Sequence, residues 1–197
     1  MSKLSFKSFE YKTISENIVK IIEDSTYDSE LADTLLNLFD YMIEKNLIGG
    51  CHALSAVLYI ALNEMGYSPI LCIGECQKNG RRPFDHSWIE IDNKTIDLSI
   101  YMPMQNKRGS FGGPVILNID SYSFAPNNLD YGINTGLPFS SDTTFAINTG
   151  LTEYMDKFPF DEDGLWTVLE KIYVYEGELD IASLKNKYKD VKRKLIR

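Results

Sequence analysis

Cysteine is scarce in this sequence, and Cys51, Cys72 and Cys76 are its three representatives among 197 residues. An odd number of cysteines, in a chain too long to need covalent cross-links, argues against a disulfide framework and favours reduced thiols. Reduced thiols are typical of the cytoplasm, so we expect a cytoplasmic protein. One of the three is a candidate reactive thiol.

A long apolar run is also missing. The longest mainly apolar stretch, residues 53–62, has about half the length that a membrane-spanning helix needs. The first residues, MSKLSFKSFEYK, lack the apolar segment of an export signal. We therefore expect neither membrane insertion nor export.

Basic residues are outnumbered, with 20 lysines and arginines against 28 aspartates and glutamates and a net charge of -8. A negative net charge is the wrong sign for a protein that binds nucleic-acid phosphates over most of its surface, so nucleic acid is disfavoured as a partner. Residues 184–197 are the exception, with seven basic residues and one acidic residue. We expect this segment to belong to a C-terminal helix, whose basic face is either solvated or docks on a partner or on the acidic body.

The composition, with 44% hydrophobic and 24% charged residues, is that of a globular protein. A length of 197 residues favours one domain with elaborations. We expect residues 1–197 to form this single domain, with a core at about 28–120, a loop-rich flap at 101–163 and a C-terminal helical part at 163–197.

Helical periodicity dominates the first third of the chain. Residues 14–24 are expected to form a short helix, and a longer one opens at Asp28-Ser29 with apolar residues at three- and four-residue steps. Residues 51–65 are apolar nearly all round, which predicts a buried central helix ended by Gly66.

Strand signals follow this helix. Short apolar runs begin at Ile70, at Phe84 and at Lys94, and the turn sequences Asn79-Gly80 and Asp92-Asn93 separate them. Three antiparallel strands between helical regions predict an α+β architecture.

The segment 101–163 is rich in Gly, Pro, Asn and Ser and contains one strand-like run, Val115 to Ile119. It also carries Ile-Asn-Thr-Gly-Leu twice, at 133–137 and 147–151, which we interpret as paired hairpin turns. Its aromatic residues are too numerous for a solvated linker. We therefore expect this segment to form an ordered flap beside the Cys51 opening and to determine which substrates the site accepts.

Cys51 directly follows Gly49-Gly50 at the predicted start of the buried helix. Unpaired backbone N–H groups and the positive end of the helix dipole favour a thiolate there. The two glycines allow a sharp turn and the close approach of a substrate backbone. The alternative is that Cys51 is a small buried hydrophobe.

His86 and Asp97 are the candidate partners of Cys51. If Asp92-Asn93 is a two-residue hairpin turn, Ile91 pairs with Lys94, and His86 and Asp97 share one face as diagonal neighbours about 7 to 8 Å apart. Cysteine as nucleophile, histidine as proton acceptor and donor, and aspartate as the group that orients the imidazole form a set able to perform acyl transfer. A three-residue loop would place Asp97 on the opposite face, so the prediction depends on this turn.

Three short stretches resemble the transglutaminase-like group of papain-fold enzymes: GGCHAL at 49–54, HSWIEID at 86–92 and IDLS at 96–99. The resemblance covers roughly residues 30–100 and implies a papain-like core with Cys51, His86 and Asp97 as its triad. Relatives in this group include cysteine peptidases, leader-peptide proteases, amide cross-linkers, arylamine acetyltransferases and members without activity. Papain has an oxyanion-hole glutamine six residues before its cysteine, where this chain has Lys45. The backbone N–H of Cys51 is then the first oxyanion donor and the second is open.

Other candidate sites in the sequence have less support. Cys72 and Cys76 lie four residues apart in a predicted strand, about 13 Å from each other, which disfavours a zinc site. His52 neighbours Cys51 on a helix and should point about 100° away, so we expect it to be a poor base for that thiol. No glycine-rich phosphate loop precedes a helix. We expect neither a cofactor nor a metal.

The sequence thus predicts a cysteine-nucleophile enzyme that hydrolyses or deamidates a peptide or amide through a Cys51 thioester. A peptide, a protein or a small acyl donor would be its substrate. The alternative is an inactive scaffold of the same fold that binds a protein or peptide, with segment 101–163 as its docking surface.

Overall fold

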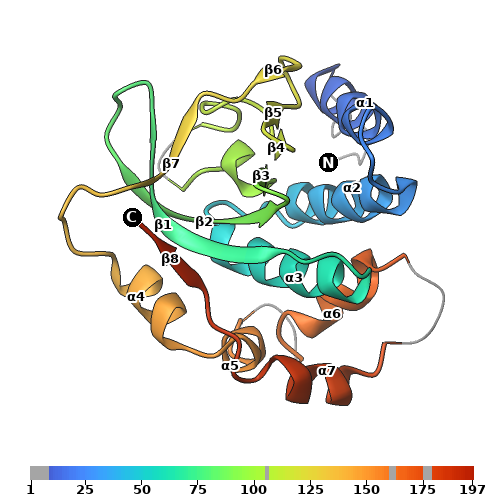
Figure 1. Ribbon diagram of the computed structural model, residues 1–197, viewed down its shortest axis with the longest axis vertical. Helices are drawn as coiled ribbons and strands as arrows, with labels where there is room; N and C mark the ends of the chain where they lie inside the picture. The colour runs from blue at the N-terminus through green and yellow to red at the C-terminus, as the bar shows by residue number, and fades with distance from the viewer. Residues whose placement is uncertain (1–8, 105–106, 160–162, 175–178) are drawn as a thin grey trace, which may run out of the picture.

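The computed structural model describes residues 9–104, 107–159, 163–174 and 179–197. It is an α+β fold, as the sequence predicts, in which helices pack on a curled sheet (Figure 1). The sheet order is β6-β5-β4-β3-β2-β1-β7, and β8 pairs with β1. The helices are α1 (Phe9–Glu23), α2 (Ser29–Glu44), α3 (Cys51–Glu64), the 3₁₀ turn η2 (Ser99–Tyr101), α4 (Ser141–Asn148), α5 (Leu151–Asp156), α6 (Trp166–Ile172) and α7 (Ile181–Tyr188). The strands are β1 (Ile70–Lys78), β2 (Phe84–Ile91), β3 (Lys94–Asp97), β4 (Val115–Ile116), β5 (Ile119–Asp120), β6 (Ala125–Pro126), β7 (Leu129–Ile133) and β8 (Lys194–Ile196).

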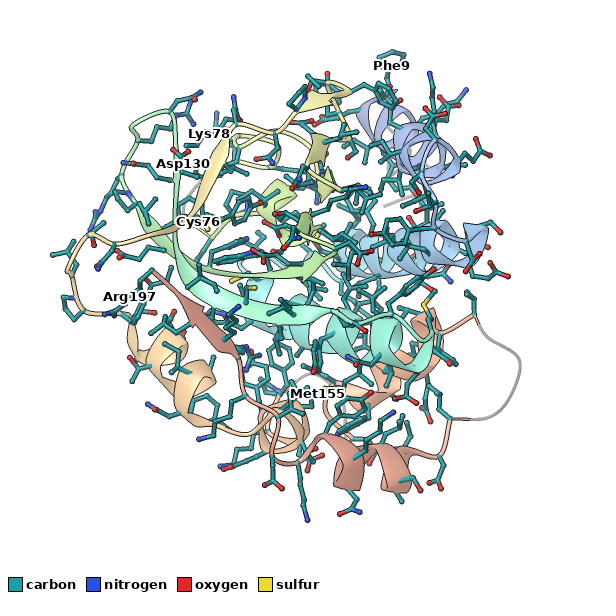
Figure 2. The ribbon with its side chains drawn as sticks, in the orientation of Figure 1. Phe9, Cys76, Lys78, Asp130, Met155 and Arg197 are labelled. Carbon is teal, nitrogen blue, oxygen red and sulfur yellow. The ribbon has the colours of Figure 1, made fainter. Side chains whose placement is uncertain are left out.

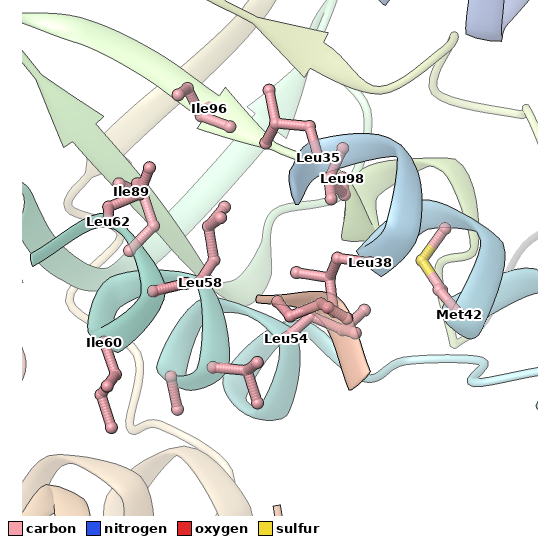
Figure 3. Close-up of a cluster of buried hydrophobic side chains, with 14 of the residues drawn as sticks. Leu35, Leu38, Met42, Leu54, Leu58, Ile60, Leu62, Ile89, Ile96 and Leu98 are labelled. Atoms are coloured by element: carbon pink, nitrogen blue, oxygen red, sulfur yellow. The ribbon is translucent and has the colours of Figure 1, made fainter. Parts of the chain in front are cut away.

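The central helix α3 is buried along most of its length, as expected from its apolar sequence. Ten of its 14 residues are buried, and Gly66 follows its end with a φ of 87° that favours glycine. Apolar side chains of α2, α3 and the sheet meet in one core (Figure 3). Those labelled are Leu35, Leu38, Met42, Leu54, Leu58, Ile60, Leu62, Ile89, Ile96 and Leu98. This core holds the start of α3 in a fixed position against β2.

The register of β2 and β3 agrees with the expected two-residue turn. Asp92 and Asn93 have φ values of 49° and 61°, the positive pair that a type I′ turn requires. Ile91 pairs with Lys94 and Ile89 with Ile96. This turn therefore places the odd-numbered isoleucines of β2 against α3 and leaves His86 and Asp97 on the opposite face.

The segment 101–163 differs from the expected loop-rich flap. The predicted strand Val115 to Ile119 is split into β4 and β5, because Leu117 and Asn118 adopt positive φ values of 51° and 70° and form a turn. The second half of the segment forms the helices α4 and α5. The two pentapeptide copies are not paired hairpin turns: one begins at the end of β7, and the other joins α4 to α5.

The prediction of a continuous C-terminal helix is wrong beyond Tyr188. The chain leaves α7 and returns as β8, which runs parallel to β1 and pairs Cys72 with Lys194. A Cβ atom at Gly74 would lie 2.4 Å from the Ile196 carbonyl oxygen, so this close approach requires glycine. The basic segment is therefore divided: Lys185 and Lys187 lie in the last turn of α7, and residues 194–196 join the sheet as β8. Within the described ranges, no helix is long and apolar enough to cross a membrane.

Candidate active site

Cys51 is the first residue of α3, with Gly50 as the N-cap. Gly49 has a φ of 69° and donates its N–H to the Met102 carbonyl at 2.8 Å. A Cβ atom at Gly49 would also lie 2.9 Å from two carbons of Met104. Glycine at this position thus gives the chain the sharp turn that starts α3, and the Cys51 thiol, 8% exposed, lies at the helix N-terminus.

His86 and Asp97 are in direct contact, as the register of β2 and β3 requires. The His86 Nε2 lies 2.7 Å from the Asp97 Oδ2, and both side chains are buried. The Tyr131 hydroxyl donates to the same Oδ2 at 2.9 Å. The Ser99 hydroxyl, at 2.7 Å, and the Ile100 N–H, at 3.2 Å, donate to Oδ1. Four partners therefore hold the carboxylate and fix the imidazole beside it.

The charges of the site favour a thiolate and an imidazolium. Burial raises the pKa of Cys51. The charges of His52 and His86 and hydrogen bonds from both imidazoles lower it by more, so that this pKa lies well below its usual value. For His86, burial lowers the pKa, and the Asp97 carboxylate and the Cys51 thiolate raise it by more. The pKa of Asp97 is lowered despite its burial, chiefly by the charge and hydrogen bond of His86. The structure thus brings the three predicted residues into one electrostatic unit.

The expectation that the His52 side chain points away from Cys51 is wrong. Its Nδ1 lies 3.8 Å from the Cys51 Sγ. The same nitrogen lies 2.7 Å from the Ser87 hydroxyl, and Nε2 lies 3.1 Å from the Thr143 hydroxyl. The helical offset separates the Cβ directions of neighbouring residues, but these two hydroxyls, from β2 and α4, hold the ring turned back toward the thiol.

Sequence reasoning missed several of these partners. Ser87 adjoins His86 in the quoted HSWIEID stretch, so its proximity could have been suspected. Tyr131, Thr143 and Arg193, whose Nη2 donates to the His52 carbonyl at 2.8 Å, come from distant parts of the chain, and no local pattern marks them.

Cys72 and Cys76 lie on β1 and share a small cluster with Trp88; Figure 2 marks Cys76 on that strand. Burial, followed by the Glu90 charge, raises the pKa of Cys72 to about 12. Burial and the Asp97 charge raise that of Cys76 well above its usual value. Within the described part of the chain, no three histidine, cysteine or acidic side chains gather as a metal site would require.

A cleft of about 400 Å³ opens beside the first turn of α3. Gly49, Gly50 and His52 form one wall, and Phe145 of α4 and Tyr154 of α5 form another. The remaining lining residues are Asn46, Leu47, Ile48, Ala53, Asp142, Lys157, Phe158 and Pro159. Part of segment 101–163 thus lines a cleft beside the first turn of α3, although helices rather than hairpins form this wall and Cys51 itself is not among the lining residues.

Comparison with known proteins found no matching family model, no matching curated protein and no matching solved structure. The case for a function therefore rests on the residues and the geometry of this site.

Proposed function

We propose that this protein is a cysteine-nucleophile acyl-transfer enzyme of the transglutaminase-like type, which hydrolyses or deamidates a peptide or amide substrate. The observation that carries the proposal is Cys51 at a helix N-terminus, with its pKa lowered by the His52 and His86 imidazoles despite its burial. The His86 imidazole in turn lies 2.7 Å from Asp97. A buried thiol with a lowered pKa and an oriented imidazole are the two groups that nucleophilic acyl transfer needs.

The reaction would proceed in two balanced steps. The Cys51 thiolate attacks the substrate carbonyl carbon, and the carbonyl oxygen becomes an oxyanion near the backbone N–H groups of the first turn of α3. The C–N bond then breaks, and the His86 imidazolium gives its proton to the leaving amine, which leaves a thioester. Water attacks the thioester while His86 takes a proton, and the acid and the Cys51 thiolate are released.

The cleft indicates which acyl groups would fit. Its walls carry three aromatic side chains, Phe145, Tyr154 and Phe158, and Phe145 is 42% exposed. Its volume of about 400 Å³ falls in the usual range for small-ligand sites. We therefore expect an acyl donor with an apolar or aromatic side chain next to the carbonyl, presented by a peptide, a protein or a small molecule.

An acylation experiment tests the proposal. N-acetyl-phenylalanine p-nitrophenyl ester, mixed with the full chain, should give a burst of one equivalent of p-nitrophenolate and add one acyl group to the Cys51 peptide in a mass spectrum. Cys51→Ala should lose the burst, and the matched control Cys72→Ala should keep it. Steady release of p-nitroaniline from the corresponding anilide would then establish amide hydrolysis.

A burst of the same size in Cys51→Ala, or an acyl group on another residue, would contradict the proposal. An unreactive Cys51 in the folded wild-type protein would favour the alternative of a binding scaffold without turnover.

A further inference from the structure

Arg193 lies between α7 and β8 and is 6% exposed, an unusual degree of burial for an arginine. Its Nη2 donates to the His52 carbonyl at 2.8 Å, and its Nη1 donates to the Ala146 carbonyl at 3.1 Å. Its guanidinium lies 4.2 Å from the centre of the Tyr154 ring. Arg193 therefore ties the C-terminal segment to the first turn of α3, to α4 and to α5.

No carboxylate among the described residues pairs with this buried cation. None of the ion pairs between described residues includes Arg193, and its buried Nε has no hydrogen-bond partner among them. A buried charge is costly unless an opposite charge compensates it. Two carbonyl oxygens and an aromatic face compensate only in part, so a negative charge nearby would complete the site.

Among the described residues, the Cys51 thiolate is one negative charge that acts on Arg193. His52 of its own helix and His86 of β2 lower the pKa of Cys51, and the charge of Cys51 in turn acts on Cys76 of β1, Tyr154 of α5 and Arg193. Burial lowers the pKa of Arg193, and the phenol of Tyr154 and the thiolate of Cys51 oppose that shift. The hydrogen bond to His52, the residue next to Cys51, gives this attraction a fixed geometry.

We propose that Arg193 is a positioning residue of the Cys51 site: it holds the first turn of α3 through the His52 carbonyl and supplies the buried positive charge that favours Cys51 as a thiolate. This inference rests on the proposed function, in which Cys51 is the nucleophile. It also gives one of the seven basic residues of segment 184–197 a place inside the protein, whereas its neighbours Lys192 and Lys194 are exposed.

The test is the pH dependence of Cys51 alkylation by iodoacetamide in the full-length protein. Arg193→Gln should raise the midpoint of the profile by about one pH unit, which makes alkylation up to about tenfold slower at pH values below the wild-type midpoint. Lys192→Gln, which removes the same charge from an exposed neighbour, should leave the midpoint unchanged. Arg193→Lys keeps the charge, so its midpoint should stay within about 0.3 units of the wild type, although its thermal stability should fall.

A folded Arg193→Gln variant with the midpoint of Lys192→Gln would overturn the inference and leave Arg193 a purely structural role. If Arg193→Gln does not fold, Arg193→Lys carries the test, because a midpoint raised by a full unit in that folded variant would refute the role of the charge. The proposed function is tested separately by His86→Gln. If the profile responds to His86 but not to Arg193, only this inference fails, and if wild-type Cys51 is unreactive, the proposed function fails.

Discussion

The start of α3 and the middle of β1 both bury cysteine thiols, but with opposite effects on their chemistry. Cys51 is 8% exposed, and Cys72 and Cys76 are fully buried. Cys51 has two imidazoles beside it, whereas Glu90 acts on Cys72 and Asp97 on Cys76. The pKa of Cys51 is lowered and those of the other two are raised, so the charges around a buried thiol decide its state, and burial alone suppresses the thiolate.

The largest effect that this comparison predicts is selective alkylation. Near neutral pH, iodoacetamide should modify Cys51 at least about 100-fold faster than Cys72 or Cys76, because only the thiolate reacts and only Cys51 has a lowered pKa. Peptide mapping of briefly treated native protein measures the three rates. Equal rates at all three cysteines would remove the difference between the two regions.

A second effect concerns stability against pH. The pKa of His86 is raised from 6.5 and that of Cys51 is lowered from 9.0. Between these two values, the unfolded pair holds one proton, on sulfur, and the folded pair also holds one, on the imidazole. Their contributions cancel, so this pair should add no slope to the wild-type free energy of unfolding in that window.

Cys51→Ala should expose the histidine contribution. His86 keeps a raised pKa beside Asp97, so its stabilisation is complete below about pH 6.5 and is lost as the pH rises through the folded pKa. The free energy of unfolding should then fall by up to about 1.4 kcal/mol per pH unit relative to wild type. Cys72→Ala should retain the wild-type slope, because that thiol is neutral in both states. Urea unfolding at several pH values provides the measurement, and parallel curves for wild type and Cys51→Ala would argue against a charged pair.

The proximity of the three candidate residues could be predicted because each depends on local geometry. Cys51 follows two glycines before an apolar helix, and the Asp92-Asn93 turn fixes which residues of β2 and β3 share a face. The α+β class and the elements from α2 to β3 follow from the same periodicities and turn signals.

What could not be predicted depends on contacts between distant segments. Val191 and Leu195 continue the apolar spacing of α7, yet β8 forms because it pairs with the Cys72–Gly74 edge of β1. Tertiary pairing overrides local propensity there. Tyr131 and Arg193 likewise reach the site through the path of β7 and of the returning C-terminal segment, which no short sequence pattern encodes.

The pairing of Cys51 with His86 is tested most directly by the pH profile of Cys51 alkylation in the wild type and in His86→Gln. We expect fast alkylation that persists to pH 6 in the wild type, because the imidazolium stabilises the thiolate, and at least a tenfold loss at pH 6 in His86→Gln. Circular dichroism of the variant should match that of the wild type. An unchanged profile in a folded His86→Gln variant would show that Cys51 and His86 do not form a reactive pair.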